Sequence, residues 1–134
     1  EAVTGDIIKR GHVLIAPGDK QMKVVKMGDM YKVECFNGPK VSGHCPSVDV
    51  LFDSVANVVK DKAIGIILTG MGGDGAKGLK AMRDAGARTV GQDESTCVVY
   101  GMPMEAYKIG GISRQLPLDQ IGSEVIYQIN KNNK

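Results

Sequence analysis

A glycine-rich stretch in the middle of the chain carries the residues best suited to chemistry. Residues 67–78 read ILTGMGGDGAKG, in which the spacing G-x-G-x-x-G runs from Gly70 to Gly75 directly after an apolar segment. Between a strand and a helix, this spacing is typical of loops that hold the phosphates of a dinucleotide. The acidic pair Asp93-Glu94 follows about 20 residues further on, as in that fingerprint. A nucleotide site is therefore one hypothesis for this loop.

Asp74 favours a different chemistry, because it lies at or just before the start of the following helix. A pyrophosphate would need the backbone N–H groups at that position for itself. A carboxylate about 4 to 6 Å from a phosphate weakens the binding of both anions, and the first cation after the loop is Lys77. An ionised carboxylate in a polar loop is a weak general base, but it can orient or stabilise a cationic partner such as a protonated histidine.

A purely structural interpretation of the same loop stays open. Asp74 would then cap the following helix, and the glycines would only shape a tight turn. However, four glycines in six residues, at 70, 72, 73 and 75, exceed the needs of a cap. This number predicts that some other part of the molecule approaches the backbone closely.

Composition excludes several classes of function. The 134 residues include 17 Lys and Arg against 15 Asp and Glu, a net charge of +2, with four Tyr, two Phe and no Trp. Proteins that bind nucleic acid usually need a cluster of basic residues and several aromatic side chains that stack on bases, and this chain has too few of both. Nucleic acid is therefore not an expected partner. The three cysteines lack C-x-x-C spacing, so we expect no metal, no disulfide framework and a cytoplasmic location. We expect no cofactor, and no membrane insertion because no apolar run reaches about 18 residues.

Hydrophobic patterns predict an alternation of strands and helices. Alternating runs at 21–27 and 30–36 flank Gly28-Asp29, which is typical of a hairpin with a type II′ turn. The strands expected from apolar runs cover residues 12–16, 63–68, 88–91, 97–100 and 112–116.

Capping residues mark the expected helices. The first follows Ser47 as N-cap, with Asp49 in its first turn, and the second runs from Ala76 to a C′ glycine at Gly86. The third begins at Pro103, and the last follows Pro117, with a frayed polar tail at 130–134. The side chains expected to point inward from the last helix are those of Leu118, Ile121, Val125, Ile126 and Ile129.

These elements predict a single domain over residues 1–134 with an α/β fold. We expect a doubly wound, mostly parallel sheet flanked by helices, with an inserted antiparallel β-hairpin. Ligands of such sheets bind beyond the carboxyl ends of the strands, which is where Asp74 falls.

Four blocks of sequence resemble a known family. HVLIAPGD, PSVDVLFDSV, GIILTGMGGDGAKG and GQDESTCVVYGMP occur in this order and cover almost the whole chain. Together they resemble the catalytic domain of the chemotaxis-type protein-glutamate methylesterases, many of which are also protein-glutamine glutaminases. The resemblance implies hydrolysis of glutamyl methyl esters on methyl-accepting chemotaxis receptors, and possibly deamidation of receptor glutamines. It also implies a Ser-His-Asp triad on a doubly wound α/β domain.

The resemblance also implies roles for particular residues. The triad aspartate of the family lies in a G-M-G-x-D-G loop, which places it at Asp74, and Met71 would line the active site beside the oxyanion region. The remaining residues of the active-site loop are then Gly70, Gly72, Gly73 and Gly75.

The match is incomplete, since the serine and histidine of the family precede the HVLIAP block. None of the six serines lies in a G-x-S-x-G setting. We therefore expect a C-terminal portion of a methylesterase catalytic domain, inactive by itself, with an exposed sheet edge that favours marginal stability or self-association. The family also implies an upstream response-regulator receiver domain as a partner. The alternative is a non-catalytic α/β module that binds the receptor or a partner domain.

Other candidate residues have simpler interpretations. A catalytic pair at His44-Cys45 is disfavoured, because adjacent side chains generally point apart. Asp93 and Glu94 fit a polar turn better than a substrate contact, and Cys97 fits a buried position in a strand. We expect Met102 and Met104 to fill the core, while Lys77, Lys80 and Arg83 form a solvated helix face that could also favour an acidic receptor helix.

Overall fold

The computed structural model describes residues 1–132 of the chain. Its strands are β1 (Gln21–Met27), β2 (Met30–Phe36), β3 (Ile64–Ile67), β4 (Arg88–Gln92) and β5 (Arg114–Leu116). Its α-helices are α1 (Val48–Val58), α2 (Ala76–Asp84), α3 (Met102–Lys108) and α4 (Leu118–Asn132), and a 3₁₀ turn covers Lys60–Lys62. The expected polar tail begins within α4, and residues 133–134 lie outside the described part.

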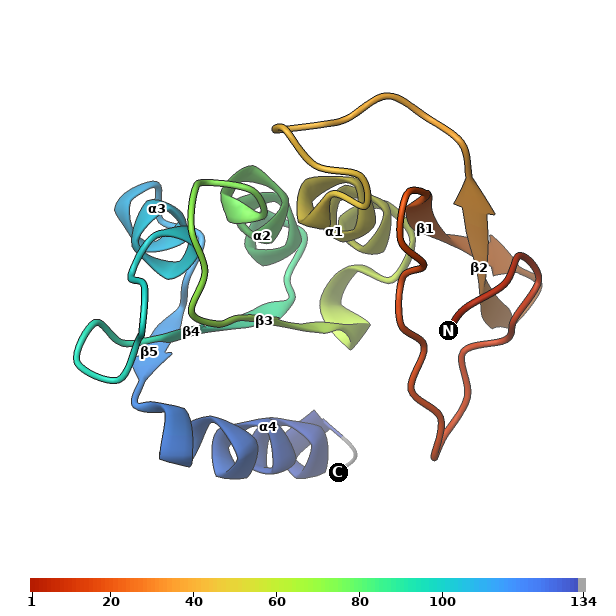
Figure 1. The fold of residues 1–134 in the computed structure, drawn as a ribbon. Coiled ribbons are helices and arrows are strands. Elements are labelled where there is room, and N and C mark those ends of the chain that lie inside the picture. The colour runs from red at the N-terminus through yellow and green to blue at the C-terminus, as the bar shows by residue number, and fades with distance from the viewer. Residues whose placement is uncertain (133–134) are drawn as a thin grey trace.

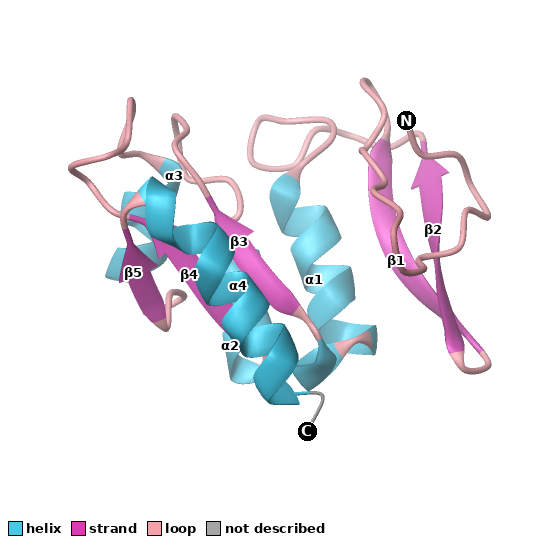
Figure 2. Ribbon diagram, turned by 90° about the horizontal axis from the view of Figure 1, so that it is seen from below, coloured by secondary structure: helices cyan, strands magenta, loops and turns pink. Residues whose placement is uncertain are grey.

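The architecture is a doubly wound α/β fold. The strands β3, β4 and β5 form a parallel sheet in that order, with α2 and α3 as the crossover helices. In Figure 1, α1, α2 and α3 lie side by side above the sheet and α4 lies below it. Figure 2 shows the β1–β2 hairpin beside α1, on the side away from the sheet. The predicted fold class is confirmed.

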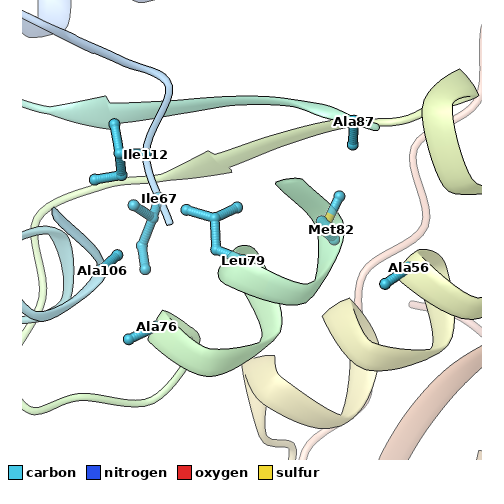
Figure 3. Close-up of a cluster of buried hydrophobic side chains, with 8 residues drawn as sticks. All are labelled: Ala56, Ile67, Ala76, Leu79, Met82, Ala87, Ala106 and Ile112. Atoms are coloured by element: carbon cyan, nitrogen blue, oxygen red, sulfur yellow. The ribbon is translucent and has the colours of Figure 1, made fainter. Parts of the chain in front are cut away.

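The core fills both faces of the parallel sheet. On one face, Leu79 and Met82 of α2 pack toward Ile67 of β3 and Ile112, with small alanines from the neighbouring elements (Figure 3). On the other face, Val90 and Leu116 pack against Ile121 of α4. Successive side chains of a strand point to opposite faces of the sheet, so β3 and β4 contribute to the core on both faces.

The hairpin forms as expected. Strands β1 and β2 are antiparallel, with Met27 opposite Met30 across the Gly28-Asp29 turn. Gly28 has a φ of +60° while Asp29 keeps a negative φ, the combination that a type II′ turn requires. The N-terminal segment lies along β2. The Asp6 carbonyl accepts a hydrogen bond from the Val33 N–H, and the Ile8 N–H donates one to the Tyr31 carbonyl.

Two expected strands do not form. Residues 12–16 have no strand conformation. In the described part of the chain, the only carbonyl of this segment that accepts a backbone hydrogen bond is that of Ile15, from the Ala2 N–H. Without a neighbouring strand, the other backbone groups cannot form the ladder of hydrogen bonds that a strand needs. Residues 97–100 form a loop whose only bridge joins Tyr100 to Gly70 among the described residues. Cys97 is accordingly half-buried in a loop and does not lie in a strand.

Fewer apolar side chains of α4 are buried than the sequence pattern predicts. Ile121 is buried and Val125 packs beside it, but Leu118, Ile126 and Ile129 are exposed. A three-stranded sheet contacts the helix along one narrow stripe, so none of the described residues covers the outer apolar side chains. No helix within residues 1–132 combines the length and apolar character needed to cross a membrane.

Candidate functional site

Asp74 lies between β3 and α2, and its carboxylate binds the N-terminus of a different helix, α1. Oδ1 accepts hydrogen bonds from the Ser47 hydroxyl at 2.7 Å and from the Asp49 N–H at 3.1 Å. Oδ2 accepts a hydrogen bond from the Val48 N–H at 2.8 Å. The side chain is 4% exposed. The negative charge therefore sits at the positive end of the α1 dipole, where N–H groups otherwise lack partners.

A second carboxylate makes the reverse contact. Asp49, in the first turn of α1, accepts a hydrogen bond from the Gly78 N–H in the first turn of α2, at 2.8 Å. Its other oxygen accepts one from the Ser42 hydroxyl at 3.2 Å. Thus each helix has a carboxylate from the other segment at its N-terminus, an arrangement that we call the reciprocal cap.

The predicted structural role of Asp74 is therefore wrong in one respect. The N-cap residue of α2 is Gly75, which has no side chain to cap with, and Asp74 caps α1 in its place. Ser47 is the N-cap residue of α1 as expected, but its hydroxyl makes no capping bond and donates to Asp74. Local sequence rules assume that a cap serves its own helix, so they could not show this exchange.

The glycines allow α1 to approach the glycine loop and the first turn of α2 closely. A Cβ on Gly75 would lie 2.9 Å from Val48 Cγ1, and one on Gly78 would lie 2.6 Å from Phe52 Cβ. Gly75 also has a φ of +97°, which a residue with a side chain rarely adopts. The predicted close approach to the glycine loop is thus confirmed, and the approaching element is a helix of the same chain.

This arrangement argues against the dinucleotide hypothesis. A pyrophosphate would bind the N–H groups of the first turn of α2. Asp49 already accepts the Gly78 N–H there, and Asp74 lies within the loop itself. Two buried carboxylates at the phosphate position would repel the ligand.

Two buried glutamines hold the surrounding loops, and neither was among the residues predicted from the sequence. The Gln21 side chain accepts the Ser47 N–H and donates to the Pro39 and His44 carbonyls. The Gln92 side chain accepts the Thr69 N–H and donates to Thr96, which ties the end of β3 to the loop after β4. Gln21 and Gln92 are only 1% exposed. Glutamine is rarely this buried, so composition offered no signal for either.

A cavity of about 320 Å³ opens beside Asp74. Its walls come from α1, α2, α3 and the loop before α1, and they are lined by Ser42, Asp49, Gly73, Asp74, Ala76, Lys77, Glu105 and Ile109. Its charged side chains are one cation, Lys77, and three carboxylates, those of Asp49, Asp74 and Glu105. Within the described residues, no three His, Cys, Asp or Glu side chains come together as a metal site.

Comparison with known proteins decides the family. The sequence profile described as CheB methylesterase matches residues 1–125 of this chain. The chain belongs to the CheB methylesterase family. A protein-glutamate methylesterase/protein-glutamine glutaminase from Syntrophomonas wolfei is 58% identical over 131 residues, which are 98% of this chain and 38% of that protein. One from Anaeromyxobacter dehalogenans is 56% identical over 126 residues, 94% of this chain and 35% of that protein.

A solved structure confirms the CheB fold. The crystal structure of the Thermotoga maritima CheB methylesterase catalytic domain matches with a TM-score of 0.92 and 34% sequence identity. The match covers 96% of this chain and 68% of that one. The chain therefore spans a little over a third of the two curated relatives and about two thirds of the solved catalytic domain.

The remaining candidate residues lie in different settings. Met71, within the glycine loop, is 77% exposed, and Val98 on the adjoining loop is exposed as well. Asp93 closes a polar turn by accepting hydrogen bonds from the Thr96 N–H and hydroxyl, which fits its expected role. His12 and His44 are exposed, and within residues 1–132 neither side chain bonds to Asp74.

The position of Asp53 in α1 gives a pH prediction. Burial, and then the Asp49 carboxylate, raise the pKa of Asp53 above 3.8. Since the folded state then holds the proton more tightly than the unfolded state, ionised Asp53 destabilises the fold above the raised pKa. Asp53→Asn is expected to increase the free energy of unfolding at pH 7 by less than about 1 kcal/mol, because the exposed side chain is screened. Urea unfolding at several pH values tests this: the gain must shrink toward zero below pH 3.8.

Proposed function

We propose that this chain forms the C-terminal portion of the catalytic domain of a protein-glutamate methylesterase. The whole enzyme would hydrolyse glutamyl methyl esters on methyl-accepting chemotaxis receptors and would also deamidate receptor glutamines. Asp74 would be the orienting carboxylate of a Ser-His-Asp triad, with the serine and the histidine outside residues 1–134. The observation that carries this proposal is a buried carboxylate held by three donors at the carboxyl edge of a parallel sheet, in a member of the CheB family.

The proposed chemistry assigns Asp74 an electrostatic role. The serine hydroxyl attacks the ester carbonyl while the histidine accepts its proton. Asp74 orients the imidazole and stabilises the imidazolium, which then protonates the departing methoxide to give methanol. Water attacks the acyl-enzyme by the same route and releases glutamate. In this proposal, Met71 and the loop glycines Gly70, Gly72, Gly73 and Gly75 shape the wall of the site beside the reacting carbonyl.

The serines of this chain are poor substitutes for the nucleophile. Ser47 is near Asp74, but it is 2% exposed and its hydroxyl donates to a carboxylate. Ser42 donates to Asp49 in the same way. A nucleophilic serine needs a histidine within hydrogen-bond reach to take its proton. Neither hydroxyl has such a partner among the described residues.

The partners and the location follow as proposals from the same function. The substrate would be the methylated helical region of a chemoreceptor, and a response-regulator receiver domain would control access to the site. A cytoplasmic location fits the three free cysteines.

Methanol release from a methylated receptor fragment tests the proposed function. The complete polypeptide that carries this chain is expected to release methanol, and ammonia from receptor glutamines. Residues 1–134 by themselves are expected to release neither. Activity of the isolated chain would show that its nucleophile lies within these residues, and an inactive complete polypeptide would refute the methylesterase proposal.

A further inference from the structure

Ser47 makes an unusual contact for the first residue of a helix. A serine at the N-cap normally accepts an N–H of its own first turn. In α1 that role passes to Asp74, which accepts the Val48 and Asp49 N–H groups. The Ser47 hydroxyl makes no capping bond and donates to Asp74 Oδ1 at 2.7 Å. Capping of α1 therefore does not require the hydroxyl, and its only hydrogen bond within residues 1–132 is to the carboxylate.

The donors divide unevenly between the two carboxylate oxygens. Each oxygen has two lone pairs to offer. Oδ1 accepts two hydrogen bonds, from Ser47 and Asp49, whereas Oδ2 accepts one, from Val48. Within the described residues, one acceptor position on Oδ2 is therefore unused.

We propose that Ser47 is a positioning residue that makes Asp74 present Oδ2 to the catalytic histidine. This inference rests on the proposed methylesterase function. By occupying Oδ1, the hydroxyl fixes the rotation of the carboxylate and directs the unused lone pair of Oδ2 toward its partner. It also withdraws charge from the carboxylate, since a hydrogen bond to the charged form stabilises that charge.

The scaffold around Ser47 supports such a role. Gln21 holds the Ser47 backbone N–H at 2.8 Å, so the main chain at this position is fixed from the hairpin side. Ser47 and Gln21 are almost fully buried. A hydroxyl on a main chain held in this way can set the orientation of a carboxylate more tightly than a mobile surface group could.

The test is Ser47→Ala in the complete methylesterase, with Ser47→Gly as a second variant that suits an N-cap. We expect kcat to fall about 10-fold with KM changed less than about twofold, because the misplaced carboxylate affects the transition state more than substrate binding. The carboxylate that has lost a donor should stabilise the imidazolium more strongly. The acidic limb of the pH profile of kcat/KM should then shift upward by about 0.3 to 0.5 pH units.

Ser54→Ala is the matched control. Ser54 also lies in α1, donates to the Leu51 carbonyl and accepts the Val24 N–H, but it is not part of the Asp74 contacts. This variant is expected to lose stability with an unchanged pH profile. Ser47→Thr, which keeps a hydroxyl, should restore the wild-type limb. An unshifted limb in both Ser47 variants, or an equal shift in Ser54→Ala, overturns the proposal.

A stability measurement, which needs no enzymatic activity, tests the Ser47–Asp74 contact separately from the proposed methylesterase function. In a double-mutant cycle of urea unfolding, Ser47→Ala and Asp74→Ala should show a coupling energy, because each substitution removes one partner of the same hydrogen bond. Additive effects would overturn the proposed positioning contact. Coupling in a polypeptide without esterase activity would instead refute the methylesterase function and, with it, the histidine assigned to Oδ2.

Discussion

Asp74→Asn is expected to lower the kcat of methyl ester hydrolysis by about 10⁴-fold in the complete enzyme, the loss seen when a serine protease has its triad carboxylate changed to an amide. The amide cannot stabilise an imidazolium, and it can hold the histidine in the wrong tautomer. A methanol-release assay at saturating substrate measures this effect directly.

The same substitution should also weaken the fold, and the two effects must be separated. The amide oxygen can still accept hydrogen bonds from Ser47 and Asp49, but the amide nitrogen would meet the Val48 N–H, donor against donor. We expect a loss of about 1–3 kcal/mol of unfolding free energy. The assay therefore needs a temperature at which circular dichroism shows the variant to be folded.

Asp93→Asn is the control for charge at this edge of the sheet. Asp93 is also a loop carboxylate after a strand, but among the described residues its side chain accepts hydrogen bonds only from Ser95 and Thr96, within its own turn. Its substitution should leave kcat within about twofold of wild type, as expected for a surface change away from the site. If Asp74→Asn, while folded, behaves like Asp93→Asn, Asp74 has only a structural role.

Gly78→Ala is expected to lower the free energy of unfolding by about 2–3 kcal/mol, the cost of overpacking a tight contact. The new Cβ would lie 2.6 Å from Phe52 Cβ and 3.2 Å from Asp49 Cα. Neither atom is at the end of a flexible side chain, so α1 must move away from α2. That movement also lengthens the hydrogen bond from Gly78 to Asp49.

Gly122→Ala provides the opposite outcome from the same chemical change. Gly122 lies within α4, and a Cβ there meets nothing within 4 Å. The added methyl group should stabilise the helix by about 0.5–1 kcal/mol, because alanine loses less backbone entropy than glycine. Urea midpoints of both variants, at an unchanged m-value, test the pair. Equal midpoints would show that α1 and α2 are not in close contact at Gly78.

Sequence patterns predicted those parts of the fold that depend on local rules. The hairpin follows from Gly28, whose positive φ is readily adopted by glycine, and the end of α2 follows in the same way from Gly86. The apolar run at 63–68 became β3, and the alternation of strands and helices predicted the layers. In each case the deciding interaction lies within a few residues along the chain.

The remaining features depend on contacts between distant segments. A single sequence shows that Asp74 precedes a helix, but not that its carboxylate reaches the helix before that one. Gln21 and Gln92 appear as ordinary polar residues until the carbonyls and N–H groups that need them are in place. The apolar run at 12–16 has the composition of a strand, but it pairs with no neighbouring strand within residues 1–132. A strand requires such a neighbour.

The reciprocal cap joins the local stability of the site to that of the helix pair. Separating α1 from α2 would expose the N–H groups of Val48, Asp49 and Gly78 to solvent in one event, since two carboxylates hold all three. These amide hydrogens should then exchange through a single cooperative opening and not by separate fraying of two helix ends. The carboxylate proposed for catalysis would thus keep its orientation for as long as the two helices stay docked, and would lose it when they part.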